Sequence, residues 1–316
     1  MDPGRALARF LSALPFLLLP AAAGDRADLP VREARWLAPG TAYRNLAAEP
    51  PECFARPADP AERRLAEIGR IAFRTPLLLG GQAARAGLSC ASCHRNGRGN
   101  RDFLFPGLSA SPGTADVTAS LISSHRGDGR FNPKPIPDLG GPRSRLRISR
   151  DPSDRKLEAF IRGLVVEEFD GPEPSAAVLD GLAAYVRALR PEACGARAGR
   201  IDLDSRLALV DRAMKIAMTE SGETRRLLLA AARSQLGEMD ERFAIPGGEP
   251  ARRILSSAGR EIGALRSGSA DWSEWRRRWP AWKRRLARLE RGSLFDPVRL
   301  RAAAAAHGAV EPPGIR

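Results

Sequence analysis

The chain has 316 residues and a mass of 34.1 kDa, which is room for about two domains of ordinary size. Its residues are 43% hydrophobic, enough for packed cores, so it is not a disordered tail. Lysine and arginine number 51 against 37 acidic residues, a net charge of +14, with only 3 His and 4 Cys. These counts exclude a zinc array, a disulfide-dense scaffold, a multihaem wire and an acidic calcium-binding protein.

The first 24 residues have the pattern of a secretory signal peptide. Arg5 and Arg9 precede an apolar run over 10–20, and small residues follow over 21–24. The run is shorter than the roughly 20 apolar residues of a spanning helix, and two prolines interrupt it. We therefore expect cleavage near Gly24 and export to the periplasm, where nucleic acid is not an expected partner. An uncleaved anchor and a cytosolic protein are the alternatives.

The following segments predict an arm, a helix and a long loop. Residues 25–59 are rich in proline, alanine and charge, which indicates a loosely structured N-terminal arm. From residue 60 apolar side chains recur at helical spacing, and Pro76 ends that helix. Residues 95–153 contain many glycines and prolines and predict a long irregular loop, a kind of segment that is usually functional.

The second half of the chain has only helical patterns. Apolar stripes over 157–165 and 178–189 predict two helices, the second ended by Pro191. Residues 195–199 resemble a linker, and residues 203–306 predict several amphipathic helices with breaks at Gly222 and 246–248. No segment has a convincing strand pattern, so we expect a mainly α fold.

Cys90-Ala91-Ser92-Cys93-His94 has the C-x-x-C-H spacing that marks the attachment of c-type haem. On a helix these side chains share one face, so two thioethers and an imidazole can reach one porphyrin. A redox dithiol would favour a βαβ context, and a zinc site would need a fourth ligand. We predict one covalent haem c on Cys90 and Cys93, with His94 as the proximal iron ligand.

The surroundings of the motif resemble bacterial di-haem cytochrome c peroxidases and MauG-type enzymes. Residues 68–73 are similar to a helix with an LG-LF pattern in that family, and residues 87–94 to its SCASCH segment. The helices over 157–164 and 179–189 are similar to those that close its cytochrome domain, so the resemblance covers about residues 60–191. It implies a cytochrome c-like haem domain over 60–194, before a helical domain of unknown role over 200–316. That family has two C-x-x-C-H motifs and this chain has one.

The second axial ligand decides the chemistry of such an iron. No methionine lies between the motif and the end of the expected haem domain. His125, in a loop with flexible glycines, is our candidate for the sixth ligand. An open or water-bound position and a sulfur from Met214 or Met218 are the alternatives.

Arginines follow the motif closely and are candidates to bind the haem propionates, because guanidinium groups pair well with carboxylates. We single out Arg98 and Arg126. A solvated surface charge is the alternative for each.

The two cysteines outside the motif, Cys53 and Cys194, are expected to form a disulfide, since spare thiols of exported proteins usually pair.

Residues 251–301 contain 14 Lys and Arg against 5 Asp and Glu. Four tryptophans recur there at helical spacing, and Pro280 is expected to kink or split the helix. The simplest interpretation is an amphipathic helix that buries its tryptophans. The alternatives are a dock for a redox partner with an acidic surface, and contact with a membrane surface. The tryptophans are Trp272, Trp275, Trp279 and Trp282.

Two functions follow from these features. The first is electron transfer by an exported mono-haem cytochrome with an appended helical domain. The second is a peroxidase-like haem oxidoreductase with an open distal site, for which His125, Asp128 or Glu167 would have to supply the acid or base. Whether the protein is an enzyme, and in what oligomeric state it works, are left open at this point.

Overall fold

The structure is a computed structural model that describes residues 29–118, 121–125, 127–142, 144 and 148–306. The expected signal peptide over 1–24, Arg126 and the sequence after residue 306 lie outside the described residues. Within the described ranges the chain is mainly helical, with 11 α-helices and a few short strands, so the mainly α prediction is confirmed. None of the helices in these ranges is long and apolar enough to cross a membrane.

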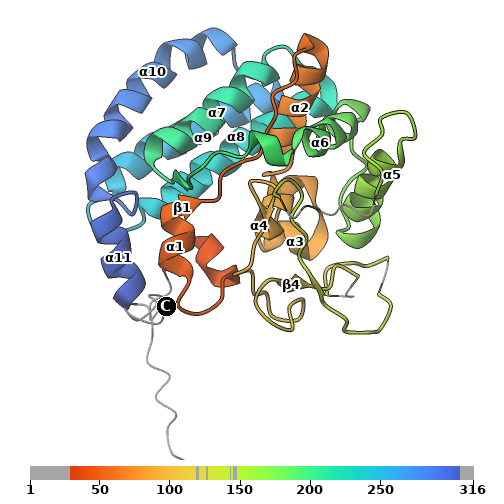
Figure 1. Ribbon diagram of the computed structural model, residues 1–316. Coiled ribbons are helices and arrows are strands. Elements are labelled where there is room, and N and C mark those ends of the chain that lie inside the picture. The colour runs from red at the N-terminus through yellow and green to blue at the C-terminus, as the bar shows by residue number, and fades with distance from the viewer. Residues whose placement is uncertain (1–28, 119–120, 126, 143, 145–147, 307–316) are drawn as a thin grey trace, which may run out of the picture.

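The helices form two packed groups with a third small cluster beside them (Figure 1). The first group contains α2 (Pro60–Ala72), α3 (Gly81–Arg85), α4 (Cys90–Cys93), α5 (Lys156–Gly163) and α6 (Ala176–Ala188). The second is a bundle of α7 (Leu203–Ala217), α8 (Gly222–Arg242), α9 (Glu249–Ser267) and α10 (Trp272–Leu289). The short α1 (Ala42–Ala47) packs beside α11 (Pro297–Ala306), so the two ends of the described chain meet.

The strands are two residues long and occur in antiparallel pairs. They are β1 (Ala48–Glu49) with β6 (Gly199–Arg200), β2 (His94–Arg95) with β3 (Arg98–Gly99), and β4 (Thr114–Ala115) with β5 (Lys134–Pro135). Between β3 and α5 the described backbone is otherwise irregular, which confirms the predicted long loop. The pairing of β1 with β6 attaches the expected linker to the N-terminal segment.

The N-terminal segment is packed, so the prediction of a loosely structured arm was wrong over residues 29–59. Leu46 is fully buried and shares a small core with Leu294 and Leu300 from the other end of the chain. The Trp36 indole N–H donates to the carbonyl of Ala86 at 2.9 Å, close to the C-x-x-C-H motif. Local composition missed this because the apolar partners are supplied by residues about 250 positions away.

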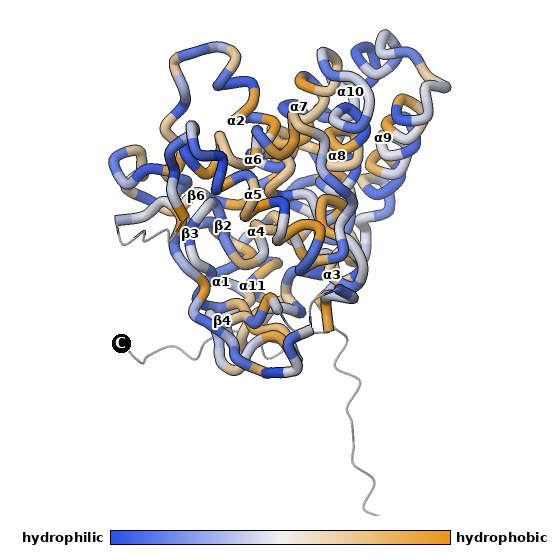
Figure 2. Tube along the Cα trace, turned by 90° about the vertical axis from the view of Figure 1, so that its right-hand side faces the viewer, coloured by the Kyte–Doolittle hydropathy of each residue, from blue (hydrophilic) through white to orange (hydrophobic). Residues whose placement is uncertain are grey.

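The bundle buries the tryptophan stripe, as the simplest interpretation predicts. Trp275 and Trp279 are buried and stack with ring centroids 4.7 Å apart, and Trp272 and Trp282 pack against the same core. Hydrophobic and hydrophilic segments alternate along α9 and α10 in Figure 2. Pro280 does not split α10, since the helix runs unbroken through it with buried side chains on both sides.

Two ion pairs connect the two helical groups, and a third joins α7 to β1. Arg206 on α7 reaches Glu49 at 2.7 Å, Arg212 reaches Glu67 at 3.0 Å, and Arg64 on α2 reaches Glu220 at 2.5 Å. The first two lie largely out of solvent, where loss of one partner leaves an uncompensated charge. The bundle is therefore held against α2 by specific contacts as well as by apolar burial through Ile71.

Helices α2 and α6 cross at a glycine pair. A β-carbon on Gly69 would lie 1.9 Å from the carbonyl oxygen of Gly181, and one on Gly181 would lie 2.7 Å from that of Leu65. Only hydrogen fits at this crossing, because a methyl group would push the two backbones apart. The sequence pattern did not reveal this role for either glycine.

We expect Gly69→Ala to lower the free energy of unfolding by about 3 kcal/mol, measured by urea denaturation, because the helices must separate. Gly237→Ala on α8 is the matched control, since nothing lies within 4 Å of its added β-carbon. The control should change stability by less than about 1 kcal/mol, in the stabilising direction. Equal effects at the two positions would contradict the tight crossing.

Candidate haem site

The C-x-x-C-H motif forms the short helix α4, which is held at both ends. The Ser89 backbone N–H donates to the Ser92 hydroxyl at 3.0 Å in a capping box, and Ala91 N–H donates to the carbonyl of Phe73 at 3.0 Å. At the other end Asn100 N–H donates to the Cys93 carbonyl at 2.8 Å. The sequence therefore folds into one helical turn attached to the end of α2. Cys90 and Cys93 lie one turn apart, half-buried and unpaired.

The His94 imidazole has a defined orientation. Its Nδ1 lies 3.0 Å from the carbonyl oxygen of Pro137. A carbonyl can only accept, so Nδ1 carries the proton and Nε2 keeps its lone pair. Burial lowers the pKa of His94 to about 4, although the Pro137 hydrogen bond and the charge of Asp138 oppose the shift. The ring is neutral at neutral pH, in the tautomer and charge state that a metal-binding histidine needs.

The environment of Cys90 and Cys93 differs from that of a reactive redox dithiol. Burial raises the pKa of the Cys90 and Cys93 thiols to about 12. Reactive dithiols have lowered pKa values in electropositive surroundings, so this pair does not resemble one. Across the described ranges no group of three or more His, Cys, Asp and Glu side chains is arranged to hold a metal ion. A zinc site thus lacks its ligand set there.

The surroundings of the motif are apolar, as a porphyrin requires. Cys90 and Cys93 pack against the core that contains Phe73, Leu88 and Leu139. The Phe73 ring lies 6.3 Å from the His94 ring between centroids. The same part of the chain exposes large apolar side chains at Leu77, Leu121, Phe131 and Phe160. Two cysteines, an oriented imidazole and apolar side chains fit a covalently attached haem.

A polar cavity of about 250 Å³ lies on the other side of α4. It is lined by Ser89, Ala91 and Ser92 rather than by the cysteines and His94. Charged residues of the N-terminal segment, α7 and α8 complete it, among them Glu49, Arg206, Glu238 and Arg242. This charged lining does not suit a porphyrin, so the cavity separates α4 from α8 rather than holding the haem.

His125 is exposed, with 64% of its side chain accessible. Its Nδ1 lies 2.9 Å from Asp170 Oδ1 and 3.2 Å from the Ser124 hydroxyl, which leaves Nε2 as the nitrogen available to a metal. The Ser123 hydroxyl donates to the Glu167 carbonyl at 2.6 Å, so the loop is attached to the segment that follows α5. No described contact joins His125 to His94, and its axial role remains a prediction.

The other predicted groups are distributed over the molecule. Asp128 is exposed and accepts the Arg130 backbone N–H at 2.8 Å, while Glu167 lies in the π-helix Leu164–Glu168 beside the His125 loop. Met214 is 2% exposed in the bundle core. Met218 follows α7, with its sulfur 3.5 Å from an Arg276 nitrogen. Met214 is thus buried in the bundle core, and the Met218 sulfur contacts α10 of the same bundle.

Arg98 has a protein carboxylate as its partner. Its Nε donates to Asp138 Oδ2 at 2.7 Å, in a pair that is about one-quarter exposed. Burial raises the pKa of Asp138, but the hydrogen bonds from Arg98, Gly141 and Gly140 outweigh that effect and lower it below its usual range. Arg98 is thus positioned by the protein itself, and its contact with a haem propionate stays a prediction.

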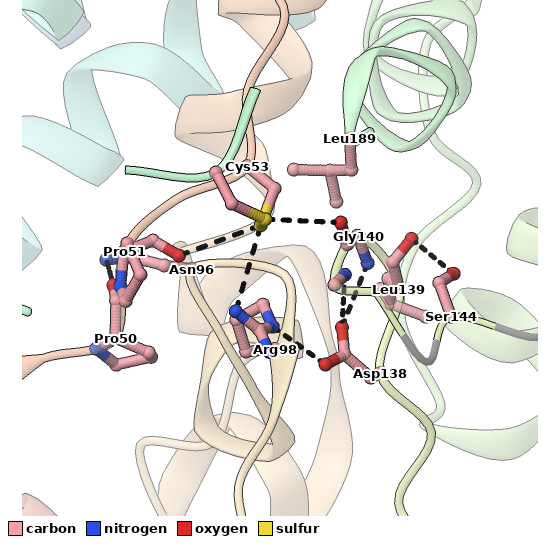
Figure 3. Close-up of a disulfide and its surroundings, with 12 residues drawn as sticks. Pro50, Pro51, Cys53, Asn96, Arg98, Asp138, Leu139, Gly140, Ser144 and Leu189 are labelled. Carbon is pink, nitrogen blue, oxygen red and sulfur yellow. Dashed lines mark hydrogen bonds and ion pairs between the residues drawn. A yellow bond between two sulfur atoms is a disulfide. The ribbon is translucent and has the colours of Figure 1, made fainter. Parts of the chain in front are cut away.

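The disulfide between Cys53 and Cys194 is present, as predicted (Figure 3). It joins positions 141 residues apart and ties the N-terminal segment to the chain after α6. Backbone hydrogen bonds support the same connection, with Arg190 N–H donating to the Cys53 carbonyl at 2.8 Å. The bond lies directly beside Gly140 and Arg98, next to the loop that supplies the acceptor of His94.

The sequence analysis missed the residues that orient His94. Asn96 and Gly97 have φ values of 52° and 76° and form the two-residue turn of the β2–β3 hairpin, which begins at His94. The dipeptide Asn-Gly is itself a hairpin signal that could have been recognised. Pro137 and Asp138 could not have been found, since they act through a carbonyl and a loop distant in sequence.

The chain matches no protein-family model, no curated protein and no solved structure.

Proposed function

We propose that this protein is an exported c-type cytochrome that carries one covalent haem and transfers electrons. Cys90 and Cys93 would form the thioethers, and His94 would bind the iron through Nε2. When bound, haem supplies a one-electron couple at its iron. The residues of the chain orient the imidazole, exclude water with apolar side chains and attach the porphyrin permanently.

The observation that carries this proposal is the hydrogen bond from His94 Nδ1 to the Pro137 carbonyl. Metal-binding histidines nearly always donate their second ring N–H to a carbonyl, carboxylate or water, which fixes the tautomer. Here that arrangement lies next to two unpaired cysteines at C-x-x-C-H spacing. A dithiol enzyme or a buried structural histidine would not need all three features together.

The periplasm is the proposed location, supported by the Cys53–Cys194 disulfide, because disulfides persist in oxidising compartments.

A peroxidase-like activity is the second candidate function. It is favoured by one observation, the carboxylate of Asp170 on His125 Nδ1, which would suit either a ligand or an acid-base group.

The proposed partner is a redox protein with an acidic surface that docks on α10. Because Trp275 and Trp279 face the core, the outer side of this helix presents arginines and no large apolar residue to enter a bilayer. In the described part of the chain Arg284, Arg285 and Arg288 form no ion pair. Uncompensated arginines on one helix side favour charge-steered docking.

Covalent attachment is the first test. Expression in a host with cytochrome maturation should yield a protein whose mass increases by one haem and whose pyridine haemochrome spectrum is that of a c-type haem. Cys90→Ala/Cys93→Ala should lose the added mass, whereas Cys53→Ser/Cys194→Ser should keep it, because that pair is structural. A wild-type chain with an unmodified mass would overturn the proposed function.

The second test separates electron transfer from peroxidase-like chemistry. We expect wild-type ferric iron to be low-spin by EPR and to become high-spin in His125→Ala, because Nε2 of that residue is the proposed sixth ligand. Asp170→Asn should give a weaker effect in the same direction by releasing Nδ1. High-spin wild-type iron that reacts with peroxide would favour the enzyme instead. Low-spin iron unaffected by the substitution would refute His125 as ligand.

The third test concerns the docking surface. Replacing Arg284, Arg285 and Arg288 together by glutamate should slow reduction by photoreduced flavodoxin, an acidic probe, roughly tenfold at low salt. The matched control reverses Arg233, Arg253 and Arg260, which are exposed on another side of the bundle. Equal loss in the two variants would mean that net charge alone is responsible. Binding of the wild type to phosphatidylglycerol vesicles, lost in the first variant only, would favour a membrane surface.

A further inference from the structure

The loop that carries the acceptor of His94 is held by the hairpin that begins at His94. The Leu139 N–H donates to the carbonyl of Gly97 at 2.9 Å, in the turn of that hairpin. Arg98, the next residue, donates from Nε to Asp138 Oδ2 at 2.7 Å. The ligand and the carbonyl that orients it are thus connected twice within a few residues.

Asp138 also organises its own loop. Its Oδ1 accepts the backbone N–H groups of Gly140 at 3.1 Å and Gly141 at 2.7 Å. Its two oxygens therefore close the turn on one side and hold Arg98 on the other. Because Asp138 directly follows Pro137, these hydrogen bonds hold the backbone next to the carbonyl that lies 3.0 Å from His94 Nδ1.

The space around this loop admits no larger residues. A β-carbon on Gly140 would lie 2.9 Å from Leu189 Cβ and 3.2 Å from Cys53 Cβ. One on Gly141 would lie 2.5 Å from an Arg98 nitrogen. The disulfide sulfur of Cys53 lies 3.8 Å from Arg98 Nη1, so the disulfide contacts the guanidinium group (Figure 3). The loop is therefore confined by Leu189, Cys53 and Arg98.

We propose that Arg98 and Asp138 are positioning residues that tune the iron through His94, an inference that rests on the proposed haem function. By fixing the Pro137 carbonyl they strengthen its hydrogen bond with Nδ1, and a stronger bond makes the imidazole more basic at Nε2. A more basic ligand stabilises ferric over ferrous iron. Loss of the Arg98–Asp138 pair therefore favours the ferrous state and raises the reduction potential.

The test is spectroelectrochemical titration of the holoprotein. Asp138→Asn, which keeps the size of the side chain, should shift the ferric–ferrous equilibrium toward ferrous iron up to about tenfold, equivalent to about 59 mV for one electron. Arg98→Gln should produce a similar shift, and the double variant no more than either single one, because all three break one pair. Asp180→Asn is the matched control, since it breaks the exposed pair between Asp180 on α6 and Arg155 at the start of α5, and it should leave the potential unchanged.

A second readout follows the hydrogen bond itself. In the ferrous protein the His94 Nδ1 proton should exchange with D₂O faster in Asp138→Asn than in the wild type, while the Asp180→Asn control exchanges at the wild-type rate. If the Arg98–Asp138 pair had a purely structural role, Asp138→Asn would lower the thermal stability without changing the reduction potential or the exchange rate of the Nδ1 proton.

The outcomes separate the two proposals. Wild-type protein without haem would overturn the proposed function, and this inference with it. A haem-loaded Asp138→Asn variant with wild-type potential and exchange would overturn the positioning role alone. A shift in Arg98→Gln without one in Asp138→Asn would also overturn it, and would favour a propionate as the partner of Arg98.

Discussion

The crossing of α2 and α6 at Gly69 and Gly181 sets the geometry on which the candidate site depends. Contact between the two backbones places the end of α2 against the last turns of α6. Phe73, which follows α2, then supplies the carbonyl that binds α4, and its ring packs on Tyr185 of α6 with centroids 5.2 Å apart. Leu189, just beyond α6, closes against Gly97 and Gly140. One close approach of two helices thereby positions both the motif and the loop opposite it.

The site combines a rigid scaffold with a long irregular segment. The described residues between 100 and 155 contain little regular structure. Their position is nevertheless fixed at three points: Pro137 lies opposite His94, Asp138 opposite Arg98, and Gly140 beside the disulfide. Irregular backbone lacks the regular backbone hydrogen bonds of helices and sheets. Here side-chain hydrogen bonds and the disulfide between Cys53 and Cys194 hold the segment instead. The bundle of α7–α10 is joined to this scaffold by ion pairs to α2, and it presents a side of α10 that is rich in arginine.

Sequence reasoning succeeded where the signal is local or chemically specific. Helical periodicity located α2, α5, α6 and the bundle, and counting cysteines predicted the disulfide. The C-x-x-C-H spacing singled out the residues of α4 as a haem site, which stays a prediction. It failed where partners are distant. The segment before Pro60 was expected to be loose because its few apolar residues are packed by the far end of the chain. The carboxylate of Asp138, 40 residues after Arg98, could not be placed beside it from the sequence, while the predicted contact of Arg98 with a propionate stays a prediction.

By itself, the sequence determined a mainly α protein with two unpaired cysteines and a histidine at the spacing of haem attachment, because these properties depend on composition, period and neighbours within one turn. Only the tertiary structure decided which nitrogen of His94 is free and which residues hold the carbonyl that orients it. Those features depend on groups that the chain brings together from 40 or more positions apart, and no local pattern encodes such distances.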